Sequence, residues 1–141
     1  MMKYHETGIK VRFNEVDAYR VAWHGHYVAW MEIGRSELAG RFGLDAFQLA
    51  ELGYLGPVVS LEIKYLRPAR FNDELTVRTR IVPGESATLV FESVIVDCNG
   101  VKLASGLTTH ALTGLDGVLQ FQLPATVAER MDAMMAWLAE P

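Results

Sequence analysis

The sequence predicts an α+β domain in which a curved antiparallel sheet wraps around one long buried helix. Two patterns support this prediction. One long segment near the N-terminus repeats apolar residues at helical spacing, and most of the chain after it alternates as β-strands do. With 141 residues the chain has the usual size of one compact domain, so we assign residues 1–141 to a single domain.

The first two elements are a strand and this long helix. Gly8–Asp17 alternates apolar and polar side chains, which indicates a half-buried strand. His26–Phe42 contains no proline, and its apolar side chains extend most of the way around a helix, which predicts that the helix is largely buried. Gly34 lies in its middle, where glycine costs about 1 kcal/mol relative to alanine. A close approach of the helix backbone to a sheet would explain this glycine.

The later elements are mainly strands. A short second helix is expected over Asp45–Leu52, and two long β-rich runs, 87–96 and 101–112, are joined by an Asn-Gly pair, a strong hairpin signal. We expect four or more strands in hairpin order, mostly antiparallel, followed by a short helix whose first turn contains Pro124. A sheet that curls around a single apolar helix buries it economically, and this arrangement is the hotdog fold.

Composition excludes several classes of function. The net charge of −4 argues against nucleic acid as the main partner, although a small phosphorylated ligand requires only a local basic patch. No apolar run reaches the ~18 residues of a membrane span. The N-terminal residues lack the apolar core of a signal peptide, so we expect a cytoplasmic protein. Cys98 is the only cysteine, which excludes an internal disulfide, and we interpret it as an unreactive turn residue.

The segment between the first strand and the long helix carries the candidate chemistry. Asp17 ends the strand, and no Ser, Thr, Asp or Asn between Arg20 and Tyr27 is available to cap the helix. The first N–H groups of the helix therefore need other acceptors, and the helix dipole adds partial positive charge there. A carboxylate beside such donors suits acyl transfer. The donors hold the carbonyl oxygen as it becomes an oxyanion, while the carboxylate attacks or activates water.

Spacing alone leaves structural interpretations of the same residues open. Asp17 can itself be the missing cap of the helix. His24 can be a packed, hydrogen-bonded histidine, and Gly25 a plain turn residue. His24 and His26 together with Asp17 lack the usual helical spacing of metal ligands, so we expect no metal site.

This segment resembles the signature of the 4-hydroxybenzoyl-CoA thioesterase family of hotdog proteins, including the branch encoded beside the Tol-Pal system. The signature consists of an aspartate, a small-residue loop, an aromatic-rich stretch and a tyrosine that opens the helix. The resemblance covers nearly the whole chain. The matching positions are Asp17, Trp23, His24, Tyr27, the helix pair Glu32 and Arg35, Phe42-Gly43-Leu44, Val58-Val59-Ser60 and Tyr65–Arg70.

The resemblance implies an acyl-CoA thioesterase, a thioester hydrolase that releases a free acid and CoA. By this likeness Asp17 is the nucleophile or general base, and backbone N–H groups near His24 and Gly25 polarise the thioester carbonyl. His24 would orient the aspartate or the attacking water. Tyr27 would line the site, although its helical spacing fits a core position equally well. No cofactor is implied, since coenzyme A is part of the substrate.

The likeness also implies binding residues and an assembly. Ser60 would reach an active site across a dimer, and Arg67 and Arg70 would bind CoA phosphates; a buried strand serine and solvated strand edges are the structural alternatives. We expect a homodimer, and beyond it a homotetramer. One departure concerns Tyr19 and Arg20, because the family usually has glycine at the second position and often at the first. Substrate preference therefore cannot be transferred.

Two rival functions stay open on the sequence. A hotdog hydratase or dehydratase would call for a catalytic histidine paired with an acid on the long helix, whereas here the acid precedes the helix. A non-catalytic acyl-CoA binding protein is the other rival, in which Arg20 would pair with Asp17 and silence it. The sequence does not reveal the acyl group.

Overall fold

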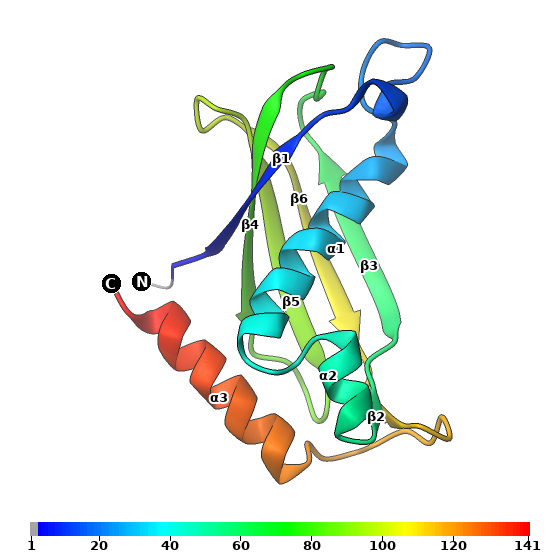
Figure 1. Ribbon diagram of the computed structural model, residues 1–141, viewed down its shortest axis with the longest axis vertical. Helices are drawn as coiled ribbons and strands as arrows, with labels where there is room; N and C mark the ends of the chain where they lie inside the picture. Colours follow the sequence, from blue (N-terminus) through cyan, green and yellow to red (C-terminus); the bar gives the residue numbers. More distant parts are fainter. Residues whose placement is uncertain (1–2) are drawn as a thin grey trace.

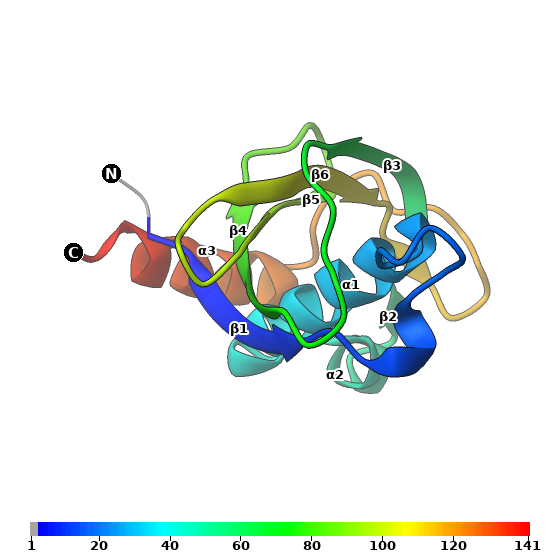
Figure 2. The same cartoon turned by 90° about the horizontal axis from the view of Figure 1, so that it is seen from above.

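The structure is a computed structural model that describes residues 3–141, and it has the predicted α+β hotdog architecture (Figure 1). A curved sheet wraps around helix α1, which lies along its inner face (Figure 2). The strands are β1 (His5–Lys10), β2 (Tyr54–Leu55), β3 (Val58–Tyr65), β4 (Glu74–Val82), β5 (Leu89–Val96), β6 (Lys102–His110) and β7 (Thr113–Gly114). The helices are the 3-10 turn η1 (Phe13–Glu15), α1 (His24–Arg41), α2 (Ala46–Glu51) and α3 (Ala125–Ala139).

The main sheet has five strands in the order β1-β4-β5-β6-β3, and every neighbouring pair is antiparallel. The expected hairpin order is therefore wrong for β3, which pairs with β6 at the far edge rather than with β4, its successor in the chain. The connection 66–73 is too long for a tight hairpin, and Leu66 and Arg67 donate their N–H groups to Leu103 O, which holds the crossing chain against β6. Strands β2 and β7 form a separate small ladder.

The N-terminal strand starts and ends earlier than predicted. It covers His5–Lys10, and the chain then turns through η1 instead of continuing to Asp17. Two of its inward-facing residues are polar, since His5 and Thr7 are buried and both contact Glu37 of α1 at 3.3 and 3.0 Å. A search for alternating apolar residues cannot detect such a strand.

Helix α1 is less enclosed than its apolar residues suggested. One side is buried against the sheet and contributes Tyr27, Trp30, Met31, Gly34, Leu38 and Ala39 to the core. On another side Ile33 is 44% exposed, so the prediction of a largely buried helix is correct only for the face that meets the sheet. This side of α1 is uncovered in the single chain because β3 is the edge strand, and in the described residues the sheet does not continue beyond it.

The close approach expected at Gly34 is confirmed. A Cβ at this position would lie 2.7 Å from Thr79 Oγ1 and 2.9 Å from Val77 Cγ1, so α1 rests directly on β4. Thr79 is fully buried, and its hydroxyl has no hydrogen-bond partner in the part of the chain that the structure describes. The fold therefore tolerates a buried polar group where helix and sheet are closest.

The smaller helices match their predictions, with one difference in length. Asp45 caps α2 by accepting the Gln48 N–H at 2.9 Å, and Gly53, just beyond the end of this helix, has a φ of +95°. Helix α3 follows Pro124 as expected, but its 15 residues make it longer than predicted. It lies across one end of the sheet (Figure 1), and Leu138 O near its end accepts the Lys3 N–H at 2.7 Å. Within residues 3–141, no helix combines the length and apolarity needed to cross a bilayer.

Replacing Gly34 with alanine tests the helix–sheet contact. Alanine favours a helix by about 1 kcal/mol, but its Cβ would overlap Thr79 and Val77, so we expect a net loss of about 1–2 kcal/mol in the free energy of unfolding. Urea denaturation measures this change. Ser36→Ala at an exposed position of α1 is the control, with an expected change within about 0.5 kcal/mol. A Gly34→Ala protein as stable as wild type would contradict the proposed packing.

Candidate active site

Asp17 lies in a compact loop between η1 and α1. The Val16–Ala22 bridge closes the loop, and inside it the Asp17 N–H donates to Val21 O at 3.0 Å while Arg20 N–H donates to Asp17 O at 2.9 Å. The half-buried Asp17 carboxylate accepts only a local bond through Oδ1, from the Tyr19 N–H at 2.8 Å. This is the Asx turn that aspartate commonly forms.

The start of α1 has no side-chain cap. Trp23 occupies the cap position without a capping bond, so Asp17 does not cap the helix in this structure. The N–H groups of Trp23 and His26 are bonded, to Glu15 O and Trp23 O at 2.9 Å each. For the N–H groups of His24 and Gly25 we find no backbone acceptor among residues 3–141. Two adjacent donors at a helix N-terminus are thus available to an oxygen from outside the helix.

Aromatic rings surround these two donors. The Trp23 indole lies over Gly25, so a Cβ at this position would displace the half-exposed ring. The His24 ring lies between Trp23 and Tyr65, with centroid distances of 4.9 and 6.2 Å. Tyr65 also donates its hydroxyl to His24 O at 2.8 Å, which joins the end of β3 to the first turn of α1.

A hollow of about 300 Å³ opens beside this helix start. His24 and Tyr27 of α1 line it, together with Tyr65 at the end of β3 and the following residues 66–68. Tyr27 lines this hollow and also belongs to the core, where it is 3% exposed. Its hydroxyl oxygen accepts the Ala69 N–H at 2.9 Å, and burial raises the pKa of Tyr27.

The other predicted site residues are more scattered. Arg67 lines the hollow, whereas Asp17, Gly25, Ser60 and Arg70 are not among its lining residues. Ser60 is exposed on the edge strand β3, so the alternative of a buried strand serine is wrong for the single chain. No hydrogen bond in the described chain joins Asp17 to His24, and the proposed orienting role of His24 therefore has no direct contact behind it.

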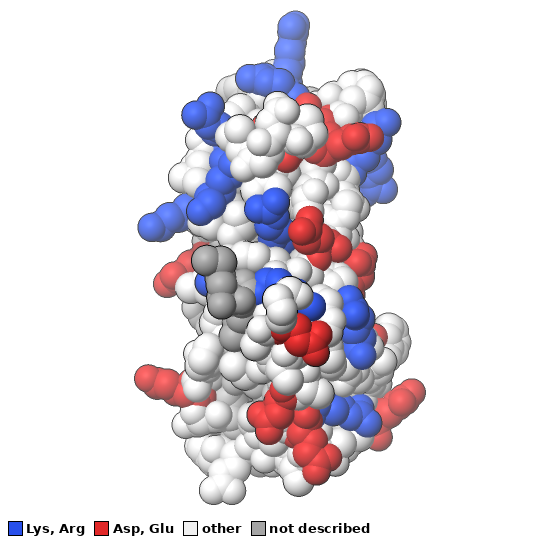
Figure 3. Space-filling model, turned by 90° about the vertical axis from the view of Figure 1, so that its left-hand side faces the viewer, with Lys and Arg blue, Asp and Glu red and all other residues white. Residues whose placement is uncertain are grey.

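Charge is unevenly distributed on the surface. On the face seen in Figure 3, Lys and Arg gather over the upper half, and Asp and Glu predominate lower down. The upper end carries the Asp17 loop and the start of α1 (Figure 1). In a chain with a net charge of −4, this basic end favours the approach of an anionic ligand.

A second hollow, of about 340 Å³, lies elsewhere on the sheet. Its rim combines Lys64 and Lys102 with Glu62 and Glu92, so opposite charges alternate around it. It includes neither the Asp17 loop nor the start of α1, and we do not assign the chemistry to it.

The sequence interpretation missed a buried carboxylate, Glu15. It is 3% exposed, and it accepts hydrogen bonds from the Arg12 N–H at 2.8 Å and from Trp30 Nε1 at 2.9 Å. Burial alone would raise the pKa of the Glu15 carboxyl, but these hydrogen bonds outweigh it and hold the pKa below its ordinary value. The only sign of this site in the sequence is an acidic residue two positions before Asp17. It falls within the predicted strand Gly8–Asp17, where a polar residue is expected to face solvent.

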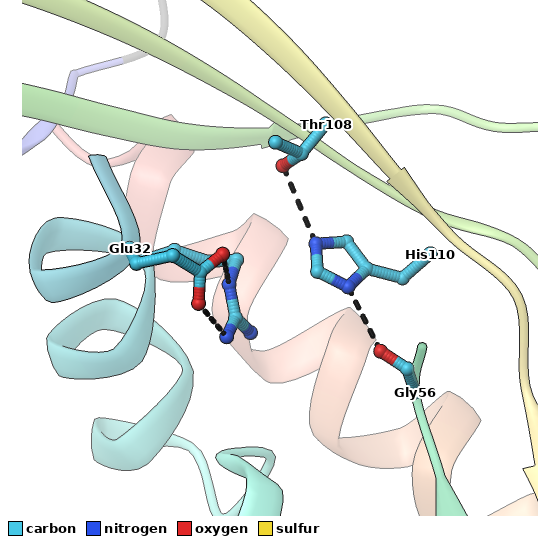
Figure 4. A network of polar contacts seen from close by, with 5 residues as sticks. Glu32, Gly56, Thr108 and His110 are labelled. Carbon is cyan, nitrogen blue, oxygen red and sulfur yellow. Dashed lines mark hydrogen bonds and ion pairs between the residues drawn. The ribbon is translucent and has the colours of Figure 1, made fainter. Parts of the chain in front are cut away.

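The helix pair Glu32 and Arg35 is confirmed as an ion pair. Arg35 Nε and Nη2 donate to the Glu32 carboxylate at 3.0 and 2.6 Å, and these bonds hold the pKa of Glu32 below its ordinary value. Close to the pair, His110 lies between Gly56 O and Thr108 Oγ1, at 2.9 and 3.3 Å (Figure 4). Burial lowers the pKa of His110, so its ring is neutral and donates from Nδ1 to the carbonyl. His110 thus joins the end of β6 to the segment before β3, whereas the Glu32–Arg35 pair lies within α1.

No group of three or more His, Cys, Asp or Glu side chains in residues 3–141 is arranged to hold a metal ion.

Comparison with known proteins connects this geometry to a family. The family model described as "Thioesterase superfamily" matches residues 19–104, a segment that begins two positions after Asp17. A hypothetical protein from Thermus thermophilus, TT1821, has a similar structure, with a TM-score of 0.82, 31% identity and coverage of 92% of this chain and 98% of that one.

Two further similarities concern named thioesterases. A second Thermus thermophilus protein, a thioesterase solved in complex with coenzyme A and Zn, is 27% identical with a TM-score of 0.77, and each chain is covered fully. The acyl-CoA thioester hydrolase YbgC of Escherichia coli O6:H1 is 29% identical over 67% of this chain and 71% of its own length. Two other relatives, from Bacillus subtilis and Arabidopsis thaliana, are matched over only 58% and 50% of their lengths.

Arg20 provides a test of strain in the candidate loop. It has a φ of +64°, where a Cβ costs roughly 1–2 kcal/mol, so glycine should be favoured despite its entropy in the unfolded chain. We expect Arg20→Gly to raise the free energy of unfolding by about 0.5–1 kcal/mol in urea titrations. The matched Arg20→Ala variant loses the same charge but keeps the Cβ, and should be neutral. Equal stabilities of the two variants would refute the strain.

Proposed function

Because this chain belongs to the thioesterase superfamily and is a thioester hydrolase, we propose that it hydrolyses an acyl-CoA with Asp17 as the central catalytic residue. Within the superfamily we place it in the 4-hydroxybenzoyl-CoA thioesterase family, on the signature residues quoted above. The Tol-Pal-associated branch is part of the same proposal.

One observation carries the assignment to Asp17. Its carboxylate is close in sequence and fold to the N-terminus of α1 but does not cap it, so both the carboxylate and the first helix donors are left for a substrate. A structural aspartate would be expected to use those donors. The hollow beside them, which His24 and Tyr27 line, has room for part of an acyl thioester.

The proposed reaction uses few groups. As Asp17 removes a proton from water, the water oxygen bonds to the thioester carbonyl carbon, and negative charge develops on the carbonyl oxygen. The N–H groups of His24 and Gly25 stabilise that charge. When the carbon–sulfur bond breaks, CoA leaves as a thiolate and takes the proton back from Asp17. In the alternative route Asp17 attacks the carbonyl carbon directly and expels CoA as a thiolate, which takes a proton from solvent. Water then hydrolyses the resulting anhydride, which releases the free acid and regenerates the Asp17 carboxylate.

Charge supports CoA as the carrier of the acyl group. The exposed Arg67 lines the hollow, and Arg70 follows on the same connection. The similar Thermus thioesterase was solved with coenzyme A, and the YbgC relative is named as an acyl-CoA thioester hydrolase. We propose no cofactor beyond the CoA of the substrate itself.

The rival functions make different predictions in one assay. A non-catalytic binding protein releases no thiol from any acyl-CoA, and a hydratase converts an unsaturated acyl-CoA without releasing CoA. No ion pair between Arg20 and Asp17 occurs in the described chain, so the structure offers no support for a silenced aspartate. Free-thiol detection over a panel of aromatic and aliphatic acyl-CoAs separates a thioesterase from both rivals and identifies the preferred acyl group. Conversion of an unsaturated acyl-CoA without thiol release then distinguishes the hydratase from the binding protein.

Asp17→Asn is the decisive substitution. Asparagine keeps an oxygen that can accept the Tyr19 N–H, so the turn should persist and the free energy of unfolding should change by about 1 kcal/mol or less. It cannot act as a base or nucleophile, and we expect kcat to fall by roughly 10²–10⁴-fold. The control His24→Ala should cost less, because the backbone N–H assigned to the oxyanion survives. A folded Asp17→Asn enzyme with near-normal kcat would refute the assignment.

We also propose a homodimer formed through the edge strand β3, with a homotetramer as the larger assembly. Strand β3 pairs with β6 on one side only, and its exposed residues include Val58, Val59 and Leu61, at 50, 62 and 43%. The exposed Ile33 adds to the apolar surface on this side of α1. Such an edge is a template for another strand, and a second copy would bury it. Ser60 lies on this edge, within the proposed interface.

Light scattering tests the assembly. We expect wild type to have at least the mass of a dimer, and Leu61→Lys to shift it towards the monomer while thioesterase activity is lost. Val118→Lys, at a 58% exposed position after β7, is the control and should change neither mass nor activity. A fully active wild-type monomer would disprove the proposal.

A further inference from the structure

We propose that Glu15 is a positioning residue that holds the Asp17 loop in register with the N-terminus of α1. This inference rests on the proposed function, since it assigns a role to Glu15 in placing the carboxylate and the oxyanion donors relative to each other. Glu15 lies two residues before Asp17 and does not line the hollow, so it acts through its neighbours rather than on the substrate.

The Glu15 side chain ties the beginning of the loop to the core. Oε1 accepts the Arg12 N–H at 2.8 Å and lies 3.5 Å from Arg12 Nε, while Oε2 accepts Trp30 Nε1–H at 2.9 Å. Trp30 is 2% exposed, in the second turn of α1, and belongs to the core cluster beneath the sheet. Both carboxylate oxygens therefore have donors, which is what a buried charge requires to be stable.

The Glu15 backbone ties the other end of the same loop. Its carbonyl oxygen accepts the Trp23 N–H at 2.9 Å. Trp23 directly precedes His24 and Gly25, whose N–H groups are the proposed oxyanion donors. Glu15 thus holds both ends of the segment 16–22. Its carboxylate attaches the start of the segment to Trp30 of α1, and its carbonyl oxygen attaches the end of the segment through the Trp23 N–H.

The loop itself provides little other burial. Ala18, Tyr19 and Arg20 are exposed, with Tyr19 at 85%, and the Asp17 carboxylate bonds only within its own turn. The Ala22 N–H donates to Ala69 O at 2.8 Å, which supports the exit but not the entrance. The Val16–Ala22 bridge and the bond from the Asp17 N–H to Val21 O fix Asp17 within the loop, and the Glu15 bonds attach that loop to α1. Misplacement of a catalytic group by about 1 Å can cost on the order of 10²-fold in rate.

Glu15→Gln tests this role with a side chain of the same shape. A glutamine has one accepting oxygen, so it can satisfy either the Arg12 N–H or the Trp30 indole, and its NH₂ group faces the other donor. We expect kcat to fall by about 10–100-fold, with KM changed by no more than about threefold, because the CoA-binding groups stay in place. Trp30→Phe removes the same indole donor while keeping the carboxylate, and should lower kcat in the same direction.

The matched control is Glu37→Gln. Glu37, like Glu15, is a carboxylate whose hydrogen bonds connect α1 to another element. It lies on α1 and bonds to Thr7 at 3.0 Å and His5 at 3.3 Å, both in β1, away from the Asp17 loop. The Glu37→Gln variant should keep the wild-type kcat even if its midpoint of thermal unfolding falls as far as that of Glu15→Gln. A structural effect alone would make kcat follow stability in both variants.

Coupling to Asp17 gives the sharpest readout. If Glu15 acts by placing Asp17, then adding Glu15→Gln to Asp17→Asn should lower kcat by less than about threefold further. If the losses of kcat in Glu15→Gln and Asp17→Asn multiply in the double variant, the inference is wrong. Normal kcat in both Glu15→Gln and Trp30→Phe would also overturn it, and either result leaves Asp17 as the catalytic residue. If Glu15→Gln does not fold, normal kcat in Trp30→Phe is sufficient to overturn it. Near-normal turnover in Asp17→Asn alone would instead refute the proposed function.

Discussion

Helix α1 can lie along the sheet as it does only because Gly34 lets its backbone rest on Val77 and Thr79 of β4. Any side chain at that point would push the helix outward. In this position α1 buries Tyr27 and Trp30 in the core near its start, and Leu38 near its end. The position of the helix N-terminus, and with it the direction of the first N–H groups, follows from this contact.

At its N-terminus the helix is completed by groups from other parts of the chain. Tyr65 and Ala69 bond to the first turn through His24 O and the Tyr27 hydroxyl, and Glu15 O accepts the Trp23 N–H. These bonds hold the helix start without occupying its first two free donors. A helix end that is held firmly but left uncapped favours an anionic oxygen there, and a thioester oxyanion is one such group.

The other side of α1 has a different character. Strand β3 leaves its outer edge unpaired, and the exposed Leu61 and Ile33 make this side apolar. Close by, the Glu32–Arg35 pair and His110 place charged and polar groups under the edge strand. In the proposed homodimer a second copy on this edge would cover the apolar surface and meet Ser60.

Sequence alone determined the features that depend on local pattern and chemistry. These are the α+β hotdog class, the lack of a capping residue between Arg20 and Tyr27, the Asn-Gly hairpin, the short second helix and the reason for Gly34. Only the tertiary structure decided that β3 crosses to β6 and that β1 is His5–Lys10, because edge choice and inward-facing polar residues depend on partners far away in the chain. Glu15 escaped the sequence interpretation for the same reason. A buried carboxylate is recognised by its donors, and the Trp30 indole reaches it only once the helix has packed against the sheet.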